Sequence, residues 1–283
     1  MALPAHVEPL ERIWFYTYRT ICGLILFFLI APILIVIPLS FNAGFYLSFT
    51  KEMLSLDPAG FSTQWYQKFL NDPNWLGAIR NSFQIAIAST IISTTLGTLA
   101  ALGLARPEMP FRKFFMALLI SPMIVPLIVS ALGMFFFFAK IGIAYTFIGV
   151  VLSHAVLGTP FVVITVTATL SGFDQSLIRA GQNLGASSRT VFFKIIMPLI
   201  LPGVVSGALF AFITSFDEVI VVKIIGSYEQ RTIPWAMFSG LREEISPTIL
   251  AVATVLVMIS VALLITMELL RRRSERLRGM SPG

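Results

Sequence analysis

The sequence predicts an all-α membrane protein with six transmembrane helices. Apolar residues make up 57% of its 283 residues and charged residues only 12%, about half the share in soluble proteins. The mean hydropathy is +0.87. A soluble domain of this composition would expose large apolar patches, and a disordered chain would need far lower hydrophobicity. Several uncharged stretches also reach the ~20 residues that a helix needs to cross the hydrocarbon core.

Six uncharged stretches are long enough, and each predicts one helix. The first is not read as a signal peptide, because its apolar run exceeds the roughly 7–15 residues of a signal core and no small-residue cleavage site follows. The expected helices cover about 21–41, 81–105, 114–138, 142–170, 199–225 and 246–268.

The loop of residues 42–80, after the first helix, is long and rich in aromatic residues. Apolar residues at helical spacing predict a short helix near 62–71. Trp65, Tyr66 and Trp75 are of the type that gathers at a membrane interface, so we expect this loop at the outer, periplasmic surface.

Prolines and glycines interrupt the third and fourth expected helices. A proline lacks the backbone donor and bends a helix, and such breaks are tolerated where protein or a cavity satisfies the freed groups. These positions fit either ordinary curvature or the flexible lining of a pathway. They are Pro122, Pro126, Gly133, Gly158 and Pro160.

The distribution of Lys and Arg predicts the orientation of the chain. The two tails and the loops after the second and fourth helices carry 13 of these residues, and the opposite loops carry 7. Positive loops stay in the cytoplasm, so we expect a cytoplasmic tail at 1–20 and a basic cytoplasmic tail at 271–283. The last tail also suits contact with anionic lipid. The net charge of +6 follows from this topology, and no nucleic-acid partner is expected.

Motifs for enzyme chemistry are missing from the sequence. It has no phosphate-binding G-x-x-x-x-G-K-[ST] loop and no G-x-S-x-G element. Cys22 is the only cysteine, and the two histidines, His6 and His154, are far apart. We therefore expect no catalytic residue, no metal site and no enzymatic activity, with His154 serving as a packing or hydrogen-bonding group.

The loop of residues 174–198, on the positive side of the membrane, is amphipathic. Gly185 marks the end of a first short helix, and Ser187 or Ser188 is placed to begin a second one. The first helix is predicted by residues at three- and four-residue spacing, namely Leu177, Ala180, Gly181 and Leu184.

This loop resembles the EAA loop of the inner-membrane permease subunits of binding-protein-dependent ABC importers. The family pattern is Glu-Ala-Ala, three residues, Gly, and then Ile-x-Leu-Pro. Three positions depart from it: Arg179 replaces the Glu, Gly181 the second Ala and Met197 the Leu. With Arg179 in place of the Glu, any salt bridge that the family's Glu would make is not expected here. The spacing of the motif is unchanged, and the resemblance extends over about 70–270. The matching residues are Ala180, Gly185, Ile195 and Pro198.

The resemblance implies a type I importer permease of the MetI-like fold in a bacterial inner membrane, with its transmembrane domain at about 77–270. Two permeases would form the pathway, a dimer of ATPase subunits would bind ATP and Mg²⁺, and a periplasmic binding protein would deliver the solute. This chain would need no cofactor of its own. The residues expected to couple it to the ATPase are Ser176, Leu177, Arg179, Ala180, Gly181, Leu184, Gly185 and Ala186.

The end of the fifth helix and the loop after it resemble permeases of the spermidine/putrescine type. Asp217 and Glu218 lie ~30 Å along this helix, near its outer end, where acidic groups would attract a cationic solute. We expect a pathway through Ser215, Phe216, Asp217 and Glu218. The alternative places the two acids at the outer headgroups, solvated or paired with Lys223. Candidates for docking the binding protein are Arg231, Arg242, Glu243 and Glu244.

Two other classes of function fit the sequence less well. An ion-gradient-driven transporter or channel often shows inverted repeats or ionisable residues at the midplane, and an integral-membrane enzyme would need a catalytic cluster. The sequence shows none of these. The solute stays open between a polyamine, an amino-acid-like amine and an iron chelate. The second permease is identical or homologous, and we expect a homologue because polyamine-type systems usually pair two different chains.

Overall fold

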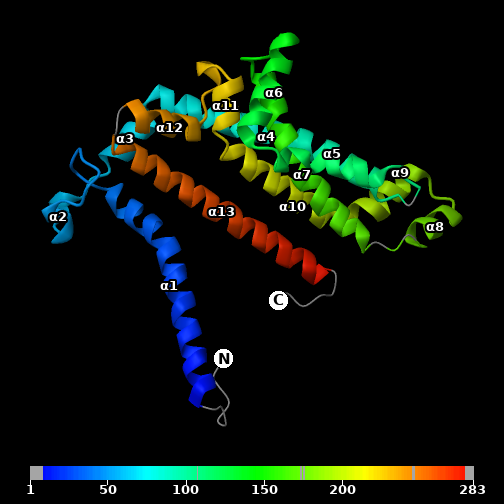
Figure 1. Cartoon of the computed structure of the whole chain (residues 1–283), viewed down its shortest axis with the longest axis horizontal. Coiled ribbons are helices and arrows are strands. Elements are labelled where there is room, and N and C mark those ends of the chain that lie inside the picture. The colour runs from blue at the N-terminus through cyan, green and yellow to red at the C-terminus, as the bar shows by residue number, and fades with distance from the viewer. Residues whose placement is uncertain (1–8, 107, 173, 175, 244–245, 278–283) are drawn as a thin grey trace. The chain divides into compact units, whose positions relative to one another are not determined.

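The computed structural model describes residues 9–106, 108–172, 174, 176–243 and 246–277 (Figure 1). Within these ranges the chain is helical, and an isolated bridge between Asn42 and Phe61 is its only extended pairing. The chain divides into two compact units. The first comprises Met1–Leu70 and Glu244–Leu256, and the second comprises Asn71–Glu243 and Val257–Gly283.

The first unit joins a long apolar helix, α1 (Pro9–Leu39), to a small folded segment. That segment contains α2 (Lys51–Leu54), the 3₁₀ turn η1 (Pro58–Gly60) and most of α3 (Gln64–Asn71). Trp65 is 4% exposed, and its Nε1 donates to the Asn42 carbonyl at 2.7 Å. The Ser40 and Tyr66 hydroxyls lie 2.6 Å apart. Trp65 therefore forms part of this segment's core, which differs from the expectation that it faces the membrane interface.

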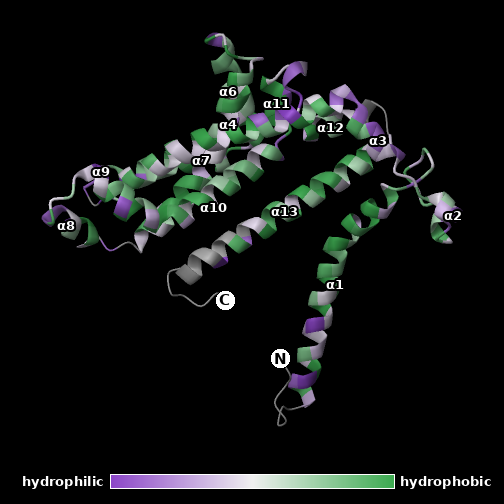
Figure 2. Cartoon of the chain, turned by 180° about the vertical axis from the view of Figure 1, so that it is seen from behind, coloured by the Kyte–Doolittle hydropathy of each residue, from purple (hydrophilic) through white to green (hydrophobic). Residues whose placement is uncertain are grey.

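The second unit is built on three long helices that pack against one another: α4, α7 and α10. The second unit also contains several shorter helices and the second part of α13 (Figures 1 and 2). The helices are α4 (Pro73–Leu104), α5 (Arg112–Ile124), α6 (Leu127–Lys140), α7 (Phe147–Ser171), α8 (Ser176–Asn183), α9 (Ser188–Val191), the π-helical turn η2 (Phe192–Ile196), α10 (Met197–Phe216), α11 (Ile220–Ile225), the 3₁₀ turn η3 (Tyr228–Gln230), α12 (Ile233–Glu243) and α13 (Thr248–Leu277).

Small residues let the three long helices approach closely. A Cβ atom on Gly207 of α10 would lie 2.8 Å from the Val162 Cα of α7, and one on Gly97 of α4 would lie 2.7 Å from the Val162 Cβ. Close approach through small residues is the usual way in which membrane helices pack. The core that results is made of Ala101, Val162, Val166, Ile200 and Ala211.

Five continuous helices in the described part of the chain are long and apolar enough to span a membrane, and α5 with α6 adds a sixth as a broken pair. These two helices meet at 105°, so the single helix expected at 114–138 is wrong. Pro126 begins the second half of the pair and has no N–H to continue the first.

The helix expected at 199–225 is also interrupted, because α10 ends at Phe216 and α11 begins at Ile220. At the chain ends, α1 begins at Pro9, inside the tail expected at 1–20. Similarly, α13 runs on to Leu277, inside the tail expected at 271–283. Residues 1–8 and 278–283 of these tails lie outside the described residues.

Candidate functional site

The predicted short helix after the fourth span is α8, and both its ends are fixed by hydrogen bonds. Asp174 accepts the Ser176 N–H at 2.8 Å, and hydrogen bonds from Ser176 lower the pKa of this carboxyl. At the other end, Gly185 has a φ of +79°. Its N–H donates to the Gln182 carbonyl at 2.9 Å, and the Ala186 N–H donates to the Gly181 carbonyl at 3.0 Å. This pair of bonds is a Schellman motif, which ends a helix and favours glycine.

The inner face of α8 packs on the start of the next span. Gly181 is buried, and a Cβ there would lie 2.8 Å from the Ile195 Cδ1. The Ser187 hydroxyl accepts the Thr190 N–H at 3.3 Å and caps α9, which leads through the π-helical turn into α10. The small residue that replaces the family's second Ala therefore allows α8 to lie close to this segment.

The outer face of α8 is open. Leu184 is 88% exposed, and Leu177, Arg179 and Ala180 are exposed as well. Figure 2 shows hydrophilic residues at α8 and α9, at the end of the second unit opposite α11 and α12. A large apolar side chain held out at a tight turn suits a contact with another protein.

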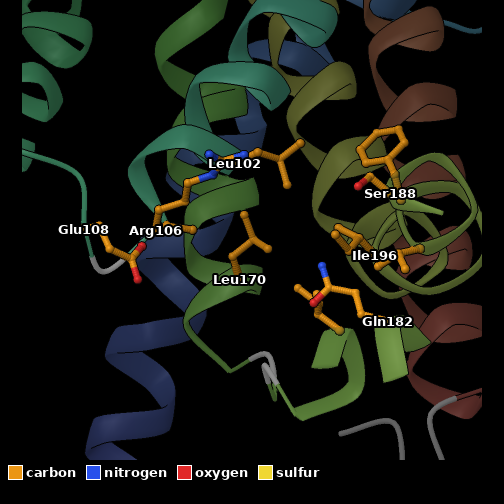
Figure 3. A pocket seen from close by; sticks show the side chains of 11 residues that line it. Leu102, Arg106, Glu108, Leu170, Gln182, Ser188 and Ile196 are labelled. Atoms are coloured by element: carbon orange, nitrogen blue, oxygen red, sulfur yellow. The ribbon is translucent and has the colours of Figure 1, made fainter. Parts of the chain in front are cut away.

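A pocket of ≈ 480 Å³ lies between α8 and the ends of the long helices (Figure 3). Arg106 and Glu108, from the segment between α4 and α5, lie on one side, and Gln182 and Ser188 lie on the other. Its apolar walls come from the helix ends, namely Leu102, Ala105, Leu170, Ile178, Val191, Phe192 and Ile196. The loop expected at 174–198 thus borders a second loop on the same end of the unit.

At the other end of α10, the four residues expected along the pathway differ in exposure. Asp217 is exposed, whereas Ser215, Phe216 and Glu218 are buried within the chain. The Glu218 carboxylate accepts the N–H groups of Ile220 and Val221 at 2.8 and 2.7 Å. Asp217 is therefore the member of this group whose carboxylate is accessible in the isolated chain.

Neither acid forms the alternative pair with Lys223 among the residues that the structure describes. The Lys223 Nζ instead lies 4.9 Å from the centroid of the Phe238 ring. Glu218 lies near His154, whose Nε2 is 3.8 Å from the Glu218 Oε2. His154 is also hydrogen-bonded to Ser215, as expected for a hydrogen-bonding group.

The segment after α11 is hydrogen-bonded to α4, and the sequence alone does not predict these contacts. The Asn81 side chain donates to the carbonyls of Glu229 and Arg231, at 2.6 and 3.0 Å. The Arg231 guanidinium lies over the Tyr228 ring at 5.5 Å. Of the other docking candidates, the side chains of Arg242 and Glu243 and all of Glu244 lie outside the described residues.

In the described ranges, no group of three or more His, Cys, Asp or Glu side chains could hold a metal ion. Long apolar helices packed around a small-residue core, with a short capped helix at one end, are the features of a multi-pass membrane protein. Residues 93–276 match the model of the binding-protein-dependent transport system inner membrane component, and the chain belongs to this family. It is a type I ABC importer permease of the MetI-like fold, a family of transport proteins rather than enzymes.

Two groups of relatives cover most of the chain. The spermidine/putrescine transport system permease protein PotC of Haemophilus influenzae is 32% identical over 248 residues, which are 88% of this chain and 93% of that protein. The putrescine transport system permease protein PotI of Escherichia coli K12 is 29% identical over 240 residues, 81% of each chain.

A solved structure shows the same fold at low identity. A chain of a bacterial ABC transporter that imports the acidic polysaccharide alginate superposes with a TM-score of 0.70 and 15% identity. The match covers 93% of this chain and 99% of that chain.

Proposed function

We propose that this chain is one of two permease subunits of an ATP-driven importer that carries a small cationic solute of the polyamine class across a bacterial inner membrane. The observation that carries the proposal is the 32% identity, over nearly the whole length of both chains, to a spermidine/putrescine permease. A putrescine permease matches as well. An ion-gradient-driven transporter, a channel or an enzyme does not fit the ABC importer permease family.

The proposed partners follow from the family. They are a dimer of ATPase subunits that binds ATP and Mg²⁺, a homologous second permease and a periplasmic solute-binding protein. One of the solved neighbours is an alginate transporter in complex with a periplasmic protein, which supports this kind of partner. The chain itself carries no cofactor in this proposal. Its two ends and the loop at 174–198 lie in the cytoplasm, and residues 42–80 lie in the periplasm.

The proposed coupling element is α8 with the turn that follows. Its outer face enters a groove of the ATPase, and closure of the ATPase pair on ATP moves α8 and turns the pathway outward. Ligand and ATP then bias the same two-state element, which is what energetic coupling requires. The exposed Leu184 and the rigid ends of α8 support this assignment.

Leu184→Asp is expected to reduce the amount of ATPase that copurifies with the permease at least tenfold. Burying a leucine is worth about 1.5–3 kcal/mol, and 1.4 kcal/mol is a factor of ten in an equilibrium. The measurement is the molar ratio of ATPase to permease after affinity purification. Leu54→Asp is the matched control, because Leu54 is also largely exposed but lies in the other unit. An unchanged ratio would exclude Leu184 from the contact.

Asp217→Asn is expected to raise the KM for spermidine uptake about fivefold. One charge pair at 4 Å in water is worth about 1 kcal/mol, and this carboxylate is exposed. Uptake is measured in proteoliposomes that contain the complete transporter and its binding protein. Glu108→Gln, an exposed acid at the opposite end of the unit, is expected to leave the KM unchanged. An unchanged KM in Asp217→Asn would contradict the role of Asp217. If the native transporter showed no ATP-dependent uptake of polyamines, that result would contradict the proposed solute.

A further inference from the structure

Four buried polar side chains meet inside the second unit, near the end of α10. Ser89 comes from α4, His154 from α7 and Ser215 from α10, and Glu218 follows α10. The most exposed of them, Glu218, is only 7% exposed. Buried polar groups are costly unless each one finds a partner, so their arrangement calls for a physical reason.

Two serine hydroxyls lie on the Nδ1 side of the His154 ring. The Ser89 Oγ lies 3.1 Å from the Ala86 carbonyl oxygen and 2.9 Å from the Ser215 Oγ, which in turn lies 2.7 Å from the His154 Nδ1. In the arrangement in which Ser215 donates its proton to Nδ1, the neutral ring carries its own proton on Nε2.

That proton is directed at a carboxylate. The His154 Nε2 lies 3.8 Å from the Glu218 Oε2 and has no hydrogen-bond partner within the described chain. This separation is longer than a hydrogen bond, and the attraction between the N–H and the carboxylate acts across it. The opposite tautomer would place a lone pair against the negative charge.

The same carboxylate begins the next helix. Glu218 accepts the N–H groups of Ile220, Val221 and Val222 at 2.8, 2.7 and 3.2 Å. These are the first N–H groups of α11, which have no partner within the helix itself. Glu218 therefore ends the preceding span and caps α11.

The helix that is capped in this way lies in the core. Val221, Val222 and Ile225 are fully buried, in a cluster with side chains of α4, α6 and α7. Its last carbonyl, that of Ile225, accepts the Tyr145 N–H at 2.8 Å. Both ends of α11 are thus fixed, one by Glu218 and the other by the segment before α7.

We infer that His154 and Glu218 are positioning residues for transport, which join α7 to the break between α10 and α11 and thereby hold α11 in place. His154 keeps the carboxylate turned toward the start of α11, and Glu218 keeps α11 in the core. Neither residue contacts the solute. The transport part of this inference rests on the proposed function, whereas the structural part does not.

Thiol labelling tests the structural part without any solute. Cys22 is the only cysteine of this chain, so Cys22→Ser gives a cysteine-free permease, and labelling is read on this chain within the assembled transporter. Val222→Cys reports on α11, and Val166→Cys, equally buried on α7 in a different cluster, is the control. We expect Glu218→Gln and His154→Leu to speed maleimide labelling of Val222→Cys at least tenfold and to leave Val166→Cys unchanged. No change at either site, or an equal rise at both, would overturn the inference.

Uptake kinetics test the transport part. Glu218→Gln and His154→Leu are expected to lower the maximal rate of spermidine uptake about tenfold at an unchanged KM, in contrast to Asp217→Asn. His154→Gln, which keeps an N–H donor, is expected to restore part of the rate. The double variant is expected to be no slower than either single one, because both act through the same contact. A raised KM with a normal maximal rate in Glu218→Gln would instead mean that Glu218 contacts the solute, and it would contradict the positioning role. If the transporter carries no polyamine, labelling still decides the structural part.

Discussion

Gly185→Val is expected to reduce the amount of solute transported per ATP hydrolysed at least tenfold, while the permease still assembles. Gly185 has a φ of +79°, where a residue with a Cβ loses roughly 1–2 kcal/mol and a β-branched residue loses more. The two hydrogen bonds that end α8 depend on this conformation, and each is worth about 1 kcal/mol. Valine therefore unwinds the end of α8 and displaces Leu184 from its position at the turn.

The measurement compares ATP hydrolysis and uptake in the same proteoliposomes. Gly172→Val is the matched control, because Gly172 has a φ of −94° at the end of α7, and a Cβ there meets no atom within 4 Å. We expect the control to keep the native ratio. A native ratio in Gly185→Val, with the ATPase still bound, would show that α8 does not transmit the movement.

The local chemistry of α8 is largely predictable from the sequence. The spacing of its small and apolar residues, Gly185 at its end and Ser187 before α9 are all signals that act within a few residues. The helix runs over Ser176–Asn183, with Gly185 at positive φ and Ser187 as a cap. The pocket beside it was not predictable, because its other side comes from Arg106 and Glu108 in a distant loop.

The break after α10 is the opposite case. Residues on both sides of it are apolar, so hydropathy predicts one continuous helix over 199–225. What ends α10 is a buried carboxylate that binds the first N–H groups of α11 and faces His154, which lies 64 positions earlier in the numbering. Periodicity carries no information about such a contact. Trp65 is similar, since an indole suits both a membrane interface and a core, and only its bond to the distant Asn42 distinguishes the two.

The packing of the long helices leads to the largest expected effect on stability. Gly207→Leu is expected to destabilise the permease by about 1–3 kcal/mol or more, because overpacking a tight core forces side chains off their rotamers or moves the backbone. A Cβ at this position would lie 2.5 Å from the Thr165 Oγ1 and 2.8 Å from the Val162 Cα. The second of these atoms belongs to the backbone of α7, so no side-chain rotation can relieve the contact.

The midpoint of thermal unfolding of the purified permease in detergent measures this effect. Gly133→Leu is the matched control, since Gly133 also lies within a helix but a Cβ there meets no atom within 4 Å. We expect Gly207→Leu to lower the midpoint by several degrees and to reduce the amount of folded protein, and Gly133→Leu to do neither. Equal midpoints in the two variants would mean that α7 and α10 are not in contact at Gly207. The core of α4, α7 and α10, on which the positions of both α8 and α11 depend, would then have to be arranged differently.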